Sequence, residues 1–151
     1  MATTNVEYHY TQCGLDNVWL TNGYEITETP YGKSLSIDDV EGLHTAITQA
    51  LIDIARPLTG DELRFLRIHL DLSQKALGEY FGKSDQSVAK WEKSEMVPKD
   101  VDYLIRHIIR QTINEKAAYV DEVERLQALD KKDYKEWLKF QETEGKWKKA
   151  V

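Results

Sequence analysis

The stretch Leu72–Glu92, which reads LSQKALGEYFGKSDQSVAKWE, predicts two short helices joined by a tight turn. Ser73 can cap the first helix, and Gly82 can adopt the left-handed conformation that ends it. Ser84 can cap the second helix after only a few more residues. Because so short a connection makes the two helices cross steeply, we expect the second helix to protrude from the domain.

The second helix of this stretch has an apolar face and a polar face. Val88 and Trp91 share one face and are expected to pack inward, so that Trp91 is a core residue rather than a stacking platform. Asp85, Gln86 and Lys90 then face outward. In the major groove of DNA a glutamine can make two hydrogen bonds to adenine, a lysine can donate to guanine, and an aspartate can accept from cytosine. A structural role for the aspartate stays open, because the helix dipole favours an acid in the first turn.

Two polar residues near helix N-termini complete the candidate DNA contacts. Gln74 and Ser84 are placed to bind phosphates, together with backbone amides and the positive end of the helix dipole. The residues that we expect to contact DNA are Gln74, Ser84, Asp85, Gln86, Ser87 and Lys90.

From Leu63 to about Ile109 the chain resembles the helix-turn-helix of lambda-type phage repressors and XRE regulators. The family pattern is Leu-Ser-Gln, two helical turns, Gly-x-Ser and then Trp-Glu-x-Gly. Leu72–Gln74, Gly82–Ser84 and Trp91–Ser94 match it without a gap, with Ser94 where glycine is common. The resemblance covers roughly a third of the chain.

This resemblance implies that Gln74 holds a phosphate and that Asp85, Gln86 and Lys90 lie at base-contacting positions. Helix-turn-helix proteins usually bind inverted repeats as two-fold dimers, because one helix supplies too few contacts for useful specificity. We therefore expect a sequence-specific transcriptional regulator of double-stranded DNA. In its simplest form it is a homodimeric repressor that occupies a palindromic operator.

Short strands are predicted before this domain. Val18–Leu20 and Tyr24–Ile26 flank Asn22-Gly23, which suits a tight hairpin turn, and a second turn at Thr29–Gly32 precedes a third strand at Ser34–Ile37. A helix of about 16 residues, Asp39–Ile54, should cover this β-meander, with Asp38 and Glu41 as a capping pair. Residues 1–58 hold 2 Lys/Arg and 8 Asp/Glu, and they account for the whole formal charge of −6. This acidic part is expected to face away from DNA, and the alternative that it is only a solvated acidic surface stays open.

The chain after Pro98 has no glycine or proline until Gly145 and is expected to be helical. A last amphipathic helix would carry Tyr134, Trp137, Leu138 and Phe140. Trp137 and Trp147 would then be exposed aromatic residues of the kind that mark a partner surface. The dimer interface is expected either in the N-terminal unit or in these C-terminal helices.

The expected fold is mainly α, with a lambda-repressor-like core, a small N-terminal β-meander plus helix, and a helical C-terminal extension. The predicted domains are a small acidic α+β unit over residues 1–57, a helix-turn-helix domain over residues 58–113, and a helical extension over residues 114–151.

A second resemblance surrounds Cys13. Tyr10–Gly14 is similar to the Cys-x-x-Cys-Gly knuckle of bacterial antitoxins that place a zinc ribbon before a helix-turn-helix, with Tyr10 in place of the first ligand. Because Cys13 is the only cysteine, we expect no zinc here. The alternatives that stay open are an antitoxin, which represses its own promoter and neutralises a toxin protein, and a protein-interaction module that does not bind DNA.

The sequence lacks the common signatures of catalysis. It has no Ser-His-Asp grouping, phosphate-binding glycine loop or His-Glu-x-x-His stretch, so we expect no catalytic residues and no cofactor. His9 and Cys13 are too few to make a metal site. With no long apolar segment and no signal-peptide pattern, the chain is expected to be cytoplasmic and not to contact a membrane.

Overall fold

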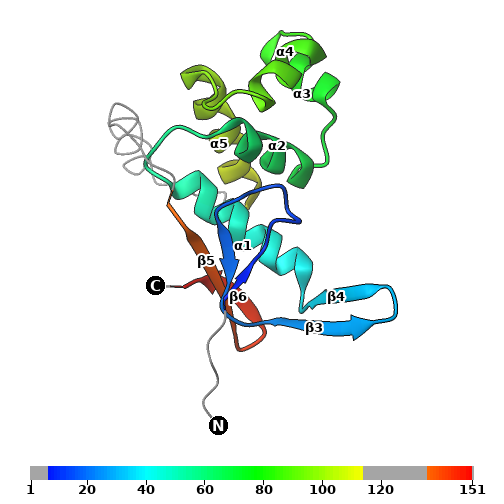
Figure 1. The fold of residues 1–151 in the computed structure, drawn as a ribbon. Helices are drawn as coiled ribbons and strands as arrows, with labels where there is room; N and C mark the ends of the chain where they lie inside the picture. Colours follow the sequence, from blue (N-terminus) through cyan, green and yellow to red (C-terminus); the bar gives the residue numbers. More distant parts are fainter. Residues whose placement is uncertain (1–6, 114–135, 151) are drawn as a thin grey trace. The chain divides into compact units, whose positions relative to one another are not determined.

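The computed structural model describes residues 7–113 and 136–150 of the chain (Figure 1). Contacts divide these residues into two units, the first formed by residues 7–47 and 136–150 and the second by residues 48–113. The boundary falls within one helix, α1. The three domains expected from the sequence, as independently folding parts, remain a prediction.

A four-stranded sheet forms the centre of the first unit. Its strands in spatial order are β1 (Tyr8–His9), β2 (Val18–Leu20), β5 (Leu138–Thr143) and β6 (Lys146–Lys149). β2 pairs parallel with β5, and the outer pairs are antiparallel. The apolar residues that alternate along the central pair are fully buried: Val18, Leu20, Leu138 and Phe140.

The β5–β6 hairpin corrects a prediction from the sequence. The helix predicted to carry Trp137, Leu138 and Phe140 is wrong, because residues 138–143 and 146–149 form the two strands. Leu138 and Phe140 are buried with the two-residue period of a strand. Glu144 and Gly145 between the strands have φ angles of 53° and 74°, as a tight hairpin turn requires.

The expected fold class is therefore only partly confirmed. The helix-turn-helix part is helical, whereas the first unit is largely built from strands that belong to two separate sheets. Tyr134 and the part of the predicted helical extension at residues 114–135 lie outside the described residues.

The two C-terminal tryptophans differ in exposure. Trp137 is 60% exposed, and its ring meets that of Trp19 edge to face at 5.7 Å. Trp147 is only 8% exposed, and its indole N–H donates to the carbonyl of Asp38 at 2.7 Å. The expectation of an exposed aromatic residue thus holds for Trp137 and is wrong for Trp147.

A separate two-stranded sheet joins β3 (Tyr24–Thr29) to β4 (Gly32–Ile37). This confirms the turn predicted at Thr29–Gly32. The hairpin predicted at Asn22-Gly23 is wrong, because β2 pairs with β1 and β5 rather than with β3. Asn22 instead accepts a hydrogen bond from the amide of Glu142 at 2.7 Å, and so helps to hold β5 beside β2.

The helix predicted over Asp39–Ile54 is present as α1 (Val40–Asp53). Asp39 occupies the capping position with a positive φ angle of 48°, and its carboxylate accepts from the amide of Gly42 at 3.1 Å. The capping residue predicted from the sequence, Asp38, lies one residue before the observed one, so the predicted capping pair of Asp38 and Glu41 is wrong by one position. The helix buries Leu43 and Ile47 in its first part.

The second unit consists of the end of α1 and four further helices. These are α2 (Gly60–His69), α3 (Gln74–Phe81), α4 (Asp85–Glu92) and α5 (Lys99–Ile113). The capping box at the start of α2 is confirmed: the Thr59 hydroxyl accepts from the amide of Glu62, and the Glu62 carboxylate accepts from the amide of Thr59. The main buried apolar side chains of α2 to α5 are Leu63, Phe65, Leu66, Leu77, Val88, Val101, Ile105 and Ile109.

Arg106 of α5 holds the segment that connects α1 to α2. Its guanidinium is fully buried, donates to the carbonyls of Ile54 and Arg56, and pairs with Asp102 at 2.9 Å. The same Asp102 accepts from the amide of Leu58 at 2.7 Å. The backbone of this non-helical segment is thus satisfied by side chains of α5, as a buried backbone must be.

Gly78 sets how closely α3 approaches the start of α4. A Cβ atom at this position would lie 2.6 Å from the carbonyl oxygen of Lys83 and 2.9 Å from that of Ser84. Both atoms belong to the backbone and cannot turn away as a side chain would. Only glycine therefore allows the two helices to come this close.

We expect Arg106→Met to lower the free energy of unfolding by about 3–5 kcal/mol, because it removes the positive partner of the buried Asp102 carboxylate and the donor to two buried carbonyls. Urea denaturation of the full chain measures this loss. Arg64→Met removes an exposed arginine of α2 and should change stability by less than about 0.5 kcal/mol. A loss below about 1 kcal/mol for Arg106→Met would contradict the role of this network.

We expect Gly78→Ala to destabilise the fold by about 1–3 kcal/mol through overpacking, although alanine is the better helix former. Thermal unfolding followed by circular dichroism tests this. Glu79→Ala, at an exposed position of the same helix, provides the control and should be nearly neutral. If Gly78→Ala were as stable as the original chain, close backbone approach would not limit the packing of α3 and α4.

Candidate nucleic-acid interface

The turn between α3 and α4 is built by local caps. Gly82 has a φ angle of 68° and ends α3, and the amide of Lys83 donates back to the carbonyl of Gly78 at 2.7 Å. The Ser73 hydroxyl accepts from the amide of Ala76, and the Ser84 hydroxyl accepts from the amide of Ser87. All three predicted caps, at Ser73, Gly82 and Ser84, are confirmed.

Helix α4 buries one side and exposes the other. Val88 is fully buried, whereas Asp85, Gln86 and Lys90 are exposed. The half-buried Trp91 packs its ring edge to face against Phe81 of α3 at 5.6 Å. This contact agrees with the packing role expected for Trp91.

Glu92, at the end of α4, connects three helices. Its buried carboxylate accepts from Nε of Arg67 on α2 at 2.6 Å and from Nη2 of the same side chain at 3.1 Å. It also accepts from the Gln74 amide at the start of α3, at 3.1 Å. Arg67 donates in addition to the carbonyl of Leu72, ahead of α3. The position of α4 is therefore set by charge-assisted hydrogen bonds as well as by apolar packing.

Arg67 and this contact of Glu92 carry no signal in the sequence that predicts their pairing. The one indication that Glu92 is buried was its place directly after Trp91, an aromatic residue that faces inward. Its partner could not be identified, because the arginine is 25 residues away in the chain.

The predicted contact residues lie at two places. Five of the six belong to α4 and its cap: Ser84, Asp85, Gln86, Ser87 and Lys90. Ser87 is half-buried, and its hydroxyl lies 3.2 Å from that of Ser84. Gln74 is the first residue of α3 and is half-buried. One N–H of its amide is used by Glu92, which leaves the second N–H of the group for another acceptor. Contact of these residues with DNA remains a prediction.

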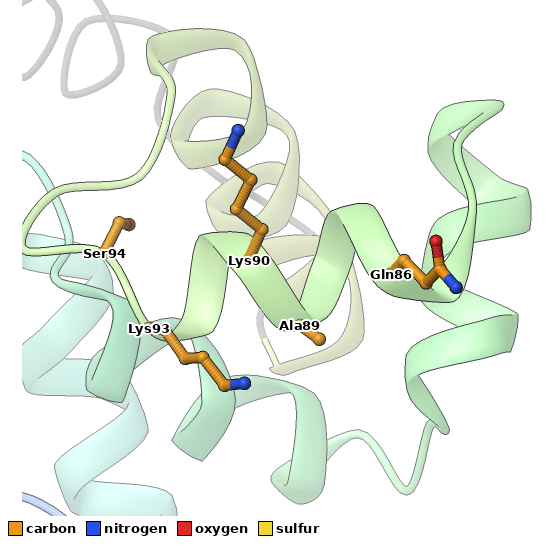
Figure 2. Close-up of a pocket in the computed structure, with 5 residues that line it drawn as sticks. All are labelled: Gln86, Ala89, Lys90, Lys93 and Ser94. Carbon is orange, nitrogen blue, oxygen red and sulfur yellow. The ribbon is translucent and has the colours of Figure 1, made fainter.

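The side of α4 that carries Gln86 contains an open surface hollow of roughly 620 Å³. Figure 2 shows the side chains that line it, from Gln86 in the first turn to the residues just beyond the end of the helix. The lining residues are Gln86, Ala89, Lys90, Lys93 and Ser94.

Ser94 stands where the family pattern commonly has glycine. It is not among the residues with a positive φ angle, so this position does not need glycine here. Its hydroxyl lies 2.6 Å from the carbonyl oxygen of Trp91 and 3.0 Å from that of Met96, and can donate to either. The serine thus satisfies backbone groups at the end of α4.

The exposed side chains of the α3–α4 segment have a positive net charge, whereas the whole chain has a negative one. Within residues 74–94 the exposed charged side chains are Lys75, Lys83, Lys90 and Lys93 against Glu79 and Asp85, which leaves an excess of two positive charges. The other acid in this range, Glu92, is buried and neutralised by Arg67. A surface with this balance attracts phosphate although the chain carries a formal charge of −6.

The residues around Cys13 have protein partners. The Cys13 thiol donates to the carbonyl of Tyr10 at 3.2 Å, and burial raises the pKa of this thiol. The Tyr10 hydroxyl lies 2.9 Å from Nε2 of His44, and burial raises the pKa of Tyr10 to about 12. His9 is hydrogen-bonded to the carbonyl of Asp16. Within the described part of the chain, no three His, Cys, Asp or Glu residues are grouped as metal ligands.

Among residues 7–113 and 136–150, no helix is both long and apolar enough to span a bilayer.

Comparison with known proteins identifies the α2–α4 region. Residues 63–101 match the helix-turn-helix family model, which takes in most of α2, all of α3 and α4, and the first residues of α5. No curated protein and no solved structure matches the chain significantly. Residues 63–101 are therefore a helix-turn-helix domain, the kind of domain with which transcription regulators bind DNA.

Proposed function

We propose that this protein is a sequence-specific transcription regulator, acting in the cytoplasm, that represses by occupying an operator in double-stranded DNA. The observation that carries the proposal is the exposed polar face of α4 within a helix-turn-helix domain. The opposite face of α4 is held by Val88 in the core and by Glu92 in its network with Arg67. A helix fixed in this way can present the same side chains to every binding site.

In the proposed complex α4 enters the major groove from its capped N-terminus. Gln86 makes paired hydrogen bonds to an adenine, Lys90 donates to a guanine or a phosphate, and Asp85 accepts from a cytosine. Ser84, Ser87 and Gln74 bind phosphates near the N-termini of α4 and α3. The excess of positive charge on this segment supports the approach of the DNA backbone.

One copy of α4 has eight residues and offers few base contacts, which favours a two-fold dimer on a palindrome. The half-sites would then lie about 34–36 Å apart, one turn of the DNA helix. Repression follows from geometry, since a dimer on a promoter occupies the surface that RNA polymerase needs.

We expect Gln86→Ala and Lys90→Ala each to weaken binding to the operator by about 5- to 150-fold, the equivalent of about 1–3 kcal/mol for a lost base contact. The operator is located by footprinting the region upstream of the protein's own operon, and affinities are then measured by gel shift. Because both side chains are exposed, the melting temperature should stay the same. Unchanged operator affinity in both variants would contradict the proposal that α4 contacts the bases of the operator.

Lys33→Ala provides a matched control, because Lys33 is exposed on β4 in the other unit. It should leave operator affinity unchanged. Raising the salt concentration should weaken binding of the original chain steeply through release of counterions from DNA. A chain that binds no DNA at low salt would instead fit a protein-interaction module built on the helix-turn-helix.

A further inference from the structure

The outward stripe of α4 contains one short side chain among long ones. Gln86, Ala89, Lys90 and Lys93 are spaced i, i+3, i+4 and i+7, so they belong to one stripe along the helix. In Figure 2 Lys90 points away from Ala89 and Lys93 and so stands at the other edge of this stripe. Three of these side chains are long and flexible, whereas Ala89 ends in a methyl group. Ala89 lines the surface hollow of roughly 620 Å³, at a place where no long side chain covers the helix.

We propose that the hollow at Ala89 recognises the C5-methyl group of a thymine. This inference rests on the proposed function and names one of the bases that the operator must contain. Among the five lining residues, Ala89 is the one whose side chain offers neither a donor nor an acceptor. The Ser94 hydroxyl, which also lines the hollow, donates its one proton to the carbonyl of Trp91 or to that of Met96.

Among the groups that bases present in the major groove, the methyl group of thymine is the apolar one. Placed against Ala89, it loses contact with water and leaves no polar group without a partner. A cytosine amino group or a purine acceptor against the same methyl group would lose a hydrogen bond to water, and Ala89 offers none in return. The chemistry of the hollow therefore favours thymine over the other bases.

The spacing along α4 relates this thymine to the base contacted by Gln86. Three residues of helix advance by about 4.5 Å, and neighbouring base pairs are about 3.4 Å apart. The thymine at Ala89 should therefore lie one or two base pairs from the adenine at Gln86. Lys93, which lines the hollow just after the end of α4, is placed to reach the phosphate backbone.

The test begins with the full chain and a pool of randomised duplex DNA, from which bound sequences are selected. Each thymine of the selected site is then replaced in turn by deoxyuridine, which removes only the C5-methyl group. We expect one position in each half-site where this replacement weakens binding by about 4-fold. At the same position, 5-methylcytosine should bind better than cytosine, because it restores the methyl group.

Ala89→Gly removes the protein's half of the contact. This variant should bind thymine-containing and deoxyuridine-containing sites equally at the responsive position. Because glycine also weakens a helix, the readout is the ratio of the two affinities and not the affinity itself. Ala76→Gly, at a half-buried position of α3, is the matched control and should keep the roughly 4-fold ratio.

The outcomes separate the two proposals. If no sequence is enriched over random duplex, the proposed function fails and this inference fails with it. If a site is selected but no thymine responds to loss of its methyl group, only the inference at Ala89 is overturned. The same conclusion follows if Ala89→Gly keeps the full response to deoxyuridine.

Discussion

The buried carboxylate of Glu92 is the constraint on which the candidate interface depends. An ionised group in a protein interior is costly unless it is paired and hydrogen-bonded, and Glu92 obtains its donors from Arg67 on α2 and Gln74 on α3. Any rotation of α4 about its axis would withdraw the carboxylate from both. The exposed face that carries Gln86 and Lys90 is therefore oriented by an interaction on the opposite side of the helix.

Two further constraints complete this scaffold. Gly78 lets the backbone of α3 lie against the start of α4, and Arg106 supplies donors to the carbonyls of the segment that precedes α2. The second unit thus combines an apolar core with buried polar groups that each require a particular neighbour. Such groups allow fewer alternative packings than apolar contacts alone, a property that suits a domain whose surface must match a rigid duplex.

Sequence analysis predicted the caps and the faces of α2 to α4 because these depend on residues close in the chain. Ser84 bonds to an amide three residues away, and Gly82 needs only its own left-handed conformation. Strand pairing could not be predicted in the same way. Asn22-Gly23 is locally suited to a hairpin, yet β2 takes β5 as its parallel neighbour, and Asn22 bonds to Glu142, 120 residues further along. Leu138 and Phe140 alternate as in a strand, but two apolar residues are too few to exclude a helix when the neighbouring strand is not known.

The helix-turn-helix, its caps and the polar face of α4 could be predicted from the chain alone, because hydrogen bonds within a few residues and the period of a helix set all three. The four-stranded sheet, the burial of Trp147, and the partners of Glu92 and Arg106 could not. A strand register or a buried ion pair depends on which distant group comes into contact. The type of a residue limits the groups that it can bind, and the fold determines which of those groups lies within reach.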